Sequence, residues 1–336
     1  MTLLKHLPLF FFFLLFFSDL FGKEGSGIVL MYHRFEDNKY PSTSVSKESF
    51  YSQLLYLKKN NFNVLPVNRL IDFFYHNKSL PSKSIFITID DAYKSFYNYA
   101  FPILKQFNYP FTIFLSTGFV HQSEESDFMD WKMLKEIKEN KGSIYNHSHK
   151  HKSFIKQTLG WVEKDILLAN QILKKNFSDS EKIISYPFGE SNKSVQELIK
   201  QLGYKIAFSQ HSSPISFDEN KFSLPRFSIN DEYGEMKRFK QVVNSKPLTF
   251  EFFEILEKND KNSLEIKFKT NFDAKKINCF INDGILLKET NEEYTKIKLT
   301  KLNKDKRYRI NCTIFKNKEL FWFGKMIIRD NGKYFY

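Results

Sequence analysis

Short apolar runs alternate with stretches of helical spacing between residues 27 and 229. The runs are typical of buried strands, whereas the stretches between them repeat apolar residues three and four apart, on one face of a helix. Strand-type runs occupy residues 28–32, 85–89, 110–115, 183–184 and 204–209, and helical stretches occupy residues 50–57, 97–107, 131–137, 162–173 and 195–202. This repetition predicts a parallel α/β fold, either a barrel or a doubly wound sheet.

The pattern changes after residues 245–247. From residue 264 onward apolar and polar residues alternate with a period of two, which is typical of strands with one buried face. These strands occupy residues 264–268, 277–281, 297–299, 308–315 and 321–328, with turn residues at 282–284 and 303–305. We therefore predict an α/β unit over residues 27–240 and a small antiparallel β-sandwich domain over residues 248–336.

The first 22 residues have a short basic start, an apolar run over residues 7–17 and then Ser18 and Asp19. The run is shorter than the ~20 apolar residues of a spanning helix, and the pattern is typical of a secretory signal peptide. Cleavage after Gly22 is our first interpretation, an uncleaved N-terminal anchor the second and a buried helix the third. We predict an exported protein that is periplasmic, extracellular or associated with a membrane through residues 1–22.

Composition narrows the function classes. Of the 336 residues 42% are hydrophobic and 26% are charged, which excludes wholesale disorder, collagen and a disulfide-dense mini-protein. The formal net charge is +13, but the surplus lysines are spread along the chain and interleaved with acids. We interpret them as a solvated surface and predict no nucleic-acid partner; weak attraction to anionic polymers is the alternative.

The two cysteines, Cys279 and Cys312, agree with export. Both lie in strand-type runs, and in an exported protein they can form a disulfide that closes a loop of about 33 residues, worth roughly 3–4 kcal/mol. Two unpaired buried thiols on neighbouring strands are the alternative.

Two clusters of ionisable residues follow strand-type runs. Asp90 and Asp91 come directly after such a run, and the ends of parallel strands are where β/α folds place catalytic groups. His147, His149 and His151 are three of the eight histidines. Neutral imidazole suits zinc, and two histidines with one carboxylate leave a coordination position open for water. A turn aspartate and a solvated polar loop are the structural alternatives.

A third segment, residues 185–189, reads Ser-Tyr-Pro-Phe-Gly and ends a short strand. Such a turn fixes the backbone and can aim an amide N–H at a developing oxyanion. Ordinary turn chemistry is the stronger interpretation of this segment taken alone.

Taken in order, these segments resemble the polysaccharide deacetylase family, metal-dependent enzymes that remove acetyl groups from N-acetylglucosamine polymers. The family signature T-F-D-D resembles residues 88–91, and its signature H-[S/T]-x-x-H is met by His147, Ser148 and His151. The third signature, R-x-P-[Y/F], is met except that Ser185 replaces its arginine.

The resemblance extends over residues 27–239. Residues 29–33 are similar to the first strand of the family's envelope-polysaccharide branch, and residues 224–226 are similar to its late arginine segment. The resemblance implies a distorted (β/α) barrel of about seven strands rather than a doubly wound sheet, followed here by the β-sandwich domain.

The resemblance also implies roles for particular residues. Asp91, His147 and His151 are expected to hold a divalent metal ion, with zinc as the favoured ion. Asp90 is expected to be the general base that deprotonates the attacking water. The backbone N–H of Tyr186 is expected to stabilise, together with the metal, the tetrahedral oxyanion.

The leaving amine needs a proton, and the family's late L-x-H segment is not intact in this chain. We nominate His211, which follows the last strand-type run of the barrel, with a satisfied loop histidine as the alternative. Arg226 is expected to orient Asp90 or to contact substrate; structural pairing with an acid is the alternative. His33 and His149 are candidates for residues that line the groove or support the metal ligands, and for His149 an exposed position is the favoured interpretation.

The favoured function is a metal-dependent hydrolase that removes N-acetyl groups from an aminosugar polysaccharide of the cell envelope or exterior. Its partner is then a polysaccharide or oligosaccharide substrate and its cofactor a divalent metal ion. Two alternatives keep the same fold. One is a carbohydrate esterase that acts on another acetylated glycan, and the other is a carbohydrate-binding or assembly protein without turnover, which the missing arginine motivates.

Overall fold

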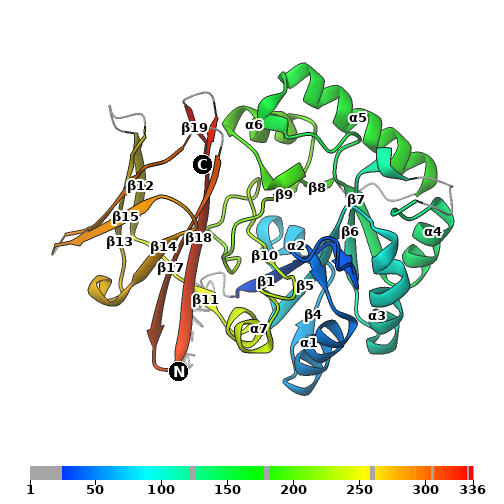
Figure 1. The fold of residues 1–336 in the computed structure, drawn as a ribbon, viewed down its shortest axis with the longest axis horizontal. Helices are drawn as coiled ribbons and strands as arrows, with labels where there is room; N and C mark the ends of the chain where they lie inside the picture. The colour runs from blue at the N-terminus through cyan, green and yellow to red at the C-terminus, as the bar shows by residue number, and fades with distance from the viewer. Residues whose placement is uncertain are drawn as a thin grey trace, which may run out of the picture.

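The computed structural model of the chain describes residues 25–120, 126–177, 182–257, 262–291, 293–303, 306–330 and 333–335. The predicted signal segment, residues 1–22, lies outside the described residues. Among the helices that are described, none is both long and apolar enough to cross a membrane. Figure 1 shows a parallel sheet surrounded by helices, with antiparallel sheets of the C-terminal part packed beside it.

A parallel sheet forms the larger part of the molecule. Its strands follow the order β10-β1-β5-β6-β7-β8-β9, with β4 paired to β5. The strands are β1 Gly27–Tyr32, β4 Asn63–Val64, β5 Ser84–Asp90, β6 Phe111–Leu115, β7 Gly142–Asn146, β8 Ile183–Ser185, β9 Ile206–Phe208 and β10 Phe227–Ser228. β1, β5 and β6 are buried along their whole length, as expected of parallel strands covered on both faces. The predicted distorted barrel of about seven strands is confirmed.

The barrel closes through the segment that precedes β10. The Leu224 amide donates to the β9 carbonyl of Ala207, and Leu224 accepts in turn from the Ser209 amide, both at 2.8 Å. Three residues further on, Phe227 pairs with Leu30 of β1. The chain therefore passes from one edge of the sheet to the other within three residues, and a buried arginine lies between the two pairings.

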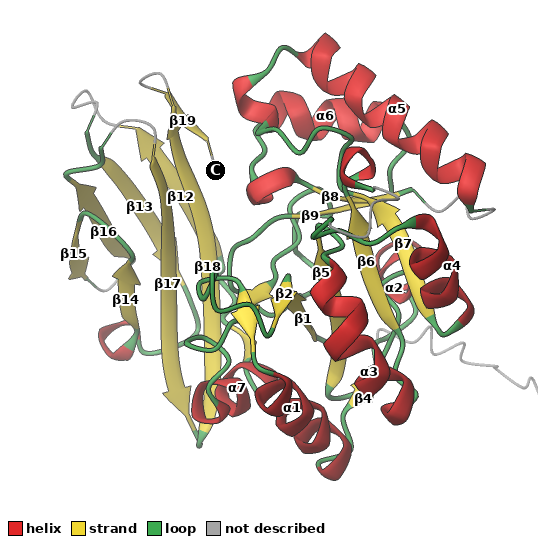
Figure 2. Cartoon of the chain, turned by 45° about the vertical axis from the view of Figure 1, so that its right-hand side comes forward, coloured by secondary structure: helices red, strands yellow, loops and turns green. Residues whose placement is uncertain are grey.

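Helices cover the outer face of this sheet (Figure 2). They are α1 Lys47–Lys59, α2 Arg69–Tyr75, α3 Phe101–Phe107, α4 Trp131–Glu139, α5 Leu159–Asn176, α6 Lys193–Gln201 and α7 Met236–Val243. Short helical turns lie at η1 Phe96–Ala100, η2 Thr117–Phe119, η3 Phe154–Lys156 and η4 Pro187–Gly189. A separate pair of short strands is formed by β2 Arg34–Phe35 and β3 Ser44–Val45. Side chains of Ser46, Asp130, Thr158 and Asn192 cap α1, α4, α5 and α6 at their first amides. The sequence did not predict α2 and α7, because seven or eight residues hold too few turns for helical spacing to stand out.

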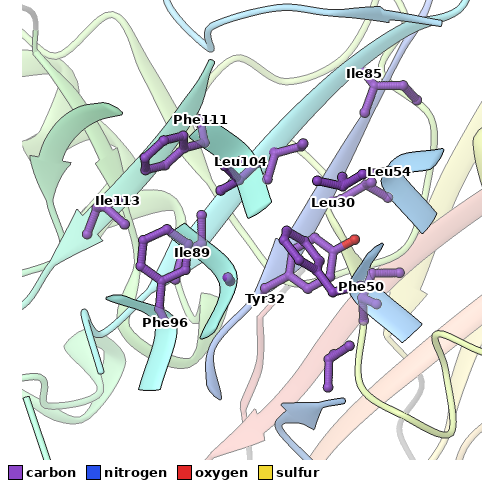
Figure 3. Close-up of a cluster of buried hydrophobic side chains, with 14 of the residues drawn as sticks. Leu30, Tyr32, Phe50, Leu54, Ile85, Ile89, Phe96, Leu104, Phe111 and Ile113 are labelled. Atoms are coloured by element: carbon purple, nitrogen blue, oxygen red, sulfur yellow. The ribbon is translucent and has the colours of Figure 1, made fainter. Parts of the chain in front are cut away.

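Alternation along the strands separates two layers of core. Outward-facing residues of β1, β5 and β6 pack against residues of α1, η1 and α3. Figure 3 labels residues from both sides of this contact: Leu30, Tyr32, Ile85, Ile89, Phe111 and Ile113 from the strands, and Phe50, Leu54, Phe96 and Leu104 from the helices. The alternate residues, such as Val29, Phe86 and Phe114, form a second cluster inside the barrel. Because side chains alternate with a period of two, Thr88 and Asp90 lie on the inner side with Phe86.

The C-terminal part is a sandwich of two sheets. One has the order β11-β18-β17-β14 with β19 paired to β18, and the other has the order β12-β13-β16-β15. The strands are β11 Lys246–Pro247, β12 Phe252–Glu257, β13 Leu264–Lys269, β14 Asn278–Ile281, β15 Ile285–Thr290, β16 Thr295–Thr300, β17 Lys306–Lys316, β18 Glu319–Asp330 and β19 Lys333–Phe335, with a short turn at η5 Ala274–Lys276. Apolar residues of β13, β16, β17 and β18 share one core between the sheets. β12 and β15 were missed because neither has a fully buried face.

The predicted disulfide is confirmed. Cys279 of β14 and Cys312 of β17 are directly opposite each other in the antiparallel ladder, and their sulfurs are bonded. The bond joins strands that are 33 residues apart in the chain, so it restricts the unfolded chain by closing that loop.

The sandwich is joined to the barrel along β18. Phe321 and Phe323 pack into the sandwich core, whereas Trp322 points the other way and meets Phe227 of the barrel edge-on at 5.1 Å. Two residues further, Gly324 lies so close to the barrel loop that a Cβ atom there would be 2.0 Å from the Ser212 carbonyl oxygen. The close approach requires glycine and holds the sheet firmly against the barrel.

We predict that Gly324→Ala destabilises the protein by about 1–3 kcal/mol, because the new methyl group overpacks the contact with Ser212. The matched control is Gly160→Ala in α5, where a Cβ atom meets nothing within 4 Å; that change should be neutral or stabilise by up to about 1 kcal/mol. Urea unfolding of the two variants checks this. Equal stabilities would mean that the sheet is not held at Gly324.

Candidate active site

Two adjacent carboxylates end β5 at the carboxyl edge of the sheet. Asp90 is the last residue of the strand and is fully buried on the inner side of the barrel. Asp91 follows in the left-handed region, with φ of 70°, and its amide donates to the Phe114 carbonyl of β6 at 3.1 Å. The change of backbone direction separates the two side chains, so each carboxylate has different neighbours.

The loop after β7 carries His147 and His151 to the same edge. Side chains hold this loop by accepting hydrogen bonds from its backbone amides. Asn146 Oδ1 accepts from the Ser148 amide, and Ser148 Oγ accepts from the His151 amide at 2.8 Å. Ser148 and His151 both have positive φ, a conformation that non-glycine residues keep only where such bonds fix it. The loop therefore presents two imidazoles in a defined arrangement.

These histidines face the second carboxylate. Asp91 Oδ1 lies 3.5 Å from His147 Nε2 and 3.2 Å from His151 Nε2, and one ligand atom of each residue lies within 4.8 Å of the others. Among the described residues, this buried Oδ1 has no hydrogen-bond partner. A buried carboxylate oxygen without a donor is costly, and a cation between the three atoms would compensate it. The residues present thus fit a divalent metal ion.

The histidines are in the protonation state that a metal requires. Burial lowers the pKa of His147 to about 3 and lowers the pKa of His151 from its ordinary value, so both are neutral near pH 7. His147 Nδ1 lies 2.8 Å from the Ser185 carbonyl, which can only accept. We therefore assign the proton to Nδ1, which leaves the Nε2 lone pair directed at the site.

The first carboxylate is held by an arginine. Arg226 donates from Nη1 and Nη2 to the two oxygens of Asp90, each at 2.7 Å, and also to the Ser185 hydroxyl at 2.7 Å. Burial alone would raise the pKa of Asp90, but the Arg226 guanidinium holds it well below its usual range. Asp90 is therefore ionised and fixed in orientation.

His33 is a site residue whose role the sequence alone did not define. Its Nε2 lies 4.0 Å from Asp90 Oδ2, and its side chain lines the groove in front of Asp91. In the ladder Tyr32 is opposite Ile89, so the next residues of β1 and β5 leave the sheet side by side. Knowledge that β1 pairs with β5 would have placed His33 beside Asp90, but a single sequence does not reveal which strands pair.

Tyr186 does not offer the amide that the sequence predicted. Its N–H donates to the Phe208 carbonyl of β9 at 3.0 Å, as part of the strand pairing, and is not free for an oxyanion. The hydrogen bonds found for this turn in the described chain engage the amides of Tyr186, Gly189 and Glu190 but not that of Phe188. Phe188 has φ of 59°, and its ring lies 4.7 Å from that of His151.

Two further predicted residues lie outside the metal-binding cluster. His149 binds Thr117 Oγ1 through Nδ1 at 2.9 Å and is not among the three clustered ligands. His211 is buried and lines a separate small pocket with Lys325, between the barrel and β18. Burial, and then the charges of Lys325 and Arg309, lower the pKa of His211 to about 3.

The groove at the cluster holds about 770 Å³ and has walls from both parts of the molecule. The barrel contributes His33, Asp91, Tyr93, Phe119, His151 and Phe188, and the sandwich contributes Phe280, Asn282, Arg307, Arg309, Asn311 and Trp322. The predicted groove residue His33 is thus in place, and the sandwich wall was not predicted.

Known proteins resemble this chain in sequence and in fold. The family model described as polysaccharide deacetylase matches residues 77–207. The chain is 31% identical over 242 residues to a poly-β-1,6-N-acetyl-D-glucosamine N-deacetylase of Staphylococcus aureus, with 63% of this chain and 82% of that protein covered. It is 26% identical over 204 residues to the protein of the same name from Staphylococcus epidermidis, with 57% and 70% covered.

Solved structures share the fold. The deacetylase PplD of Streptococcus pyogenes superposes with a TM-score of 0.60 at 22% identity and covers 65% of this chain and 98% of its own. IcaB from Ammonifex degensii superposes with a TM-score of 0.57 at 22% identity and covers 64% and 96%.

We predict that His211→Gln reduces the loss of stability on acidification. Because the folded state keeps His211 neutral down to about pH 3, only the unfolded chain takes up its proton below the ordinary pKa of 6.5. The wild type should therefore lose up to about 1.4 kcal/mol more per pH unit than the variant below pH 6.5. Urea unfolding between pH 7.5 and 5 measures this, and parallel stability curves would contradict it.

Proposed function

The chain belongs to the polysaccharide deacetylase family and is a hydrolase that removes N-acetyl groups from an aminosugar polysaccharide; from this premise we propose that its substrate is a β-1,6-linked poly-N-acetylglucosamine. The names of its Staphylococcus relatives support that linkage. The linkage rests on those names, whereas the observation that carries the hydrolytic chemistry is the pair of carboxylates with different surroundings: Asp90 is held by Arg226, and Asp91 faces two imidazoles.

We propose that Asp91, His147 and His151 hold the metal and that it is zinc. Two imidazoles and one carboxylate form a donor set typical of catalytic zinc, and the buried, unpartnered Asp91 Oδ1 supports a cation there. When bound, zinc lowers the pKa of water and polarises a carbonyl group, which supplies a nucleophile near neutral pH.

Asp90 is the proposed general base. The two hydrogen bonds from Arg226 keep its carboxylate ionised and in one orientation, and each oxygen retains a lone pair for a further donor. Asp90 therefore takes a proton from the water that attacks the acetyl carbonyl, a role worth typically about 10²–10⁴-fold in rate. The amide of Phe188, a residue whose ring lies beside His151, is the proposed donor to the oxyanion in place of the Tyr186 amide.

His33 is the proposed donor of the proton to the leaving amine. As the C–N bond of the acetamide breaks, acetate forms and the sugar nitrogen needs that proton to leave as an amine. His33 lies in the groove within 4.0 Å of Asp90, whereas His211 lines another pocket. This geometry supports His33 over the residue that the sequence nominated.

We further propose that the protein is exported. The pattern of residues 1–22 and the Cys279–Cys312 disulfide both support an oxidising compartment outside the cytoplasm. We propose residues 27–240 as the catalytic unit and residues 248–336 as an accessory unit. Whether the first segment is cleaved or anchors the chain is decided by N-terminal sequencing of the protein from the membrane and soluble fractions.

We predict that purified protein releases acetate and free amine from β-1,6-linked N-acetylglucosamine oligomers, that chelation stops the reaction and that added zinc restores it. His147→Ala should abolish zinc binding in a thermal-shift titration. It should also reduce activity by more than about 100-fold, because loss of a residue that only supports a metal ligand already costs about 10–100-fold. His149→Ala is the matched control from the same loop and should keep both. Zinc-loaded protein that releases no acetate would contradict the proposed substrate.

We predict that His33→Ala lowers kcat on the oligomer by about 10²–10⁴-fold, because the amine no longer receives its proton. The loss should shrink for 4-nitrophenyl acetate, since nitrophenolate leaves without protonation. A merely structural role of His33 would reduce both activities equally. A larger kcat loss in His211→Gln than in His33→Ala would instead support the histidine nominated from the sequence.

A further inference from the structure

The sandwich presents a row of polar side chains to the groove. Along β17, Tyr308 and Ile310 point into the sandwich core, so the alternate residues Arg307, Arg309 and Asn311 lie on the barrel side. This sheet is held against the barrel at Trp322 and Gly324. The row is therefore a fixed wall of the groove, which is also lined by two of the proposed metal ligands, Asp91 and His151.

Arg309 is only partly compensated in this wall. Its Nε donates to the Gln210 carbonyl at 3.3 Å, and within the described part of the chain it forms no ion pair with a carboxylate. Burial, and then the like charge of its neighbour Arg307, lower the pKa of Arg309 from its ordinary value, and the negative charge of Glu190 offsets only part of this. A half-buried guanidinium beside another is unfavourable unless an anion compensates it.

Arg307 places a positive charge close to His151, a proposed metal ligand. Its guanidinium lies 5.8 Å from the centre of the Phe188 ring, and the Phe188 ring lies 4.7 Å from that of His151. Arg307 also contacts Glu190, with 3.4 Å between Nε and Oε1, so it is partly neutralised. The Phe188 ring thus lies between Arg307 and His151, a proposed metal ligand.

The charge of the groove as a whole is uneven. The described lining contains three arginines, Arg238, Arg307 and Arg309, and a single carboxylate, Asp91. Asp91 faces the two histidines rather than the arginines, so it does not neutralise them. A neutral glycan needs hydrogen bonds but no surplus of positive charge.

We propose that Arg307 and Arg309 form a subsite for an oxyanion, a carboxylate or a phosphate, carried by the glycan near the sugar that is deacetylated. The proposal rests on the proposed function and narrows its substrate to an aminosugar polymer with acidic substituents. The planar fork of a guanidinium matches carboxylate and phosphate oxygens with two parallel hydrogen bonds. The sandwich is thereby assigned a part in substrate selection.

The test compares three β-1,6-linked N-acetylglucosamine oligomers of one length: unmodified, phosphorylated and O-succinylated. Calorimetry on the zinc-loaded full chain measures their affinities, and KM is measured for those that are turned over. We expect the wild type to bind an anionic oligomer at least about tenfold more tightly than the neutral one, as for hydrogen bonds to charged groups. Tighter binding of the phosphorylated oligomer would identify phosphate as the ligand of the subsite, and tighter binding of the O-succinylated oligomer would identify a carboxylate.

Variants assign the preference to the arginines. Arg309→Gln should bring the ratio of the affinities towards one, whereas Arg309→Lys, which keeps the charge and loses the fork, should retain part of it. Lys298→Gln removes the same charge from the exposed face of β16 in the opposite sheet and should leave the ratio unchanged.

The outcomes separate the two proposals. Turnover with equal affinities for neutral and anionic oligomers would overturn the subsite alone, and it would mean that the arginines bind neutral hydroxyl groups. A preference that survives Arg309→Gln would overturn its assignment to this residue. A charge preference that is lost in Arg309→Gln, with no acetate released from any oligomer, would support the subsite and contradict the proposed function.

Discussion

The buried ion pair between Arg226 and Asp90 connects the closure of the barrel to its chemistry. Arg226 lies where the chain crosses from β9 to β1, and its guanidinium contacts Asp90 of β5 and Ser185 of β8. Burying two charges costs several kcal/mol per ion, and only good geometry and further hydrogen bonds offset that cost. Here both carboxylate oxygens are engaged, so the same contact that neutralises the buried charge also fixes the proposed base. Loss of either partner would leave an unpaired charge inside the barrel.

The same pair explains the departure at residue 185. The family signature has an arginine there, and this chain has a serine. In the structure the Ser185 hydroxyl accepts a hydrogen bond from Arg226, so a cation reaches Asp90 from a different segment of the chain. A small residue at 185 leaves room for that side chain. The missing arginine is therefore not a sign of a lost site, because the charge that Asp90 needs is supplied from the segment that closes the barrel.

The groove is built from two parts that meet closely. Trp322 and Gly324 set the distance between the sandwich and the barrel, and the polar face of β17 then becomes one side of the groove. A residue without a side chain at the contact allows the sheet to approach to van der Waals distance. The position of the arginines relative to Asp91, His147 and His151 thus depends on packing at Gly324, a residue without a proposed role in the chemistry.

Much of the fold and of the candidate site was predictable from the residue pattern. Periodicity located most strands and helices, because burial of one face imposes a period of two or 3.6 on the residues themselves. The positions of Asp90, Asp91, His147 and His151 after strand ends were also readable, since parallel strands end at one edge. The pairing of the strands, in contrast, becomes known only from the folded chain. With it come the position of His33 beside Asp90, the hydrogen bond that occupies the Tyr186 amide and the position of His211 in another pocket. These facts depend on contacts between distant segments, and a local pattern carries no information about its partner.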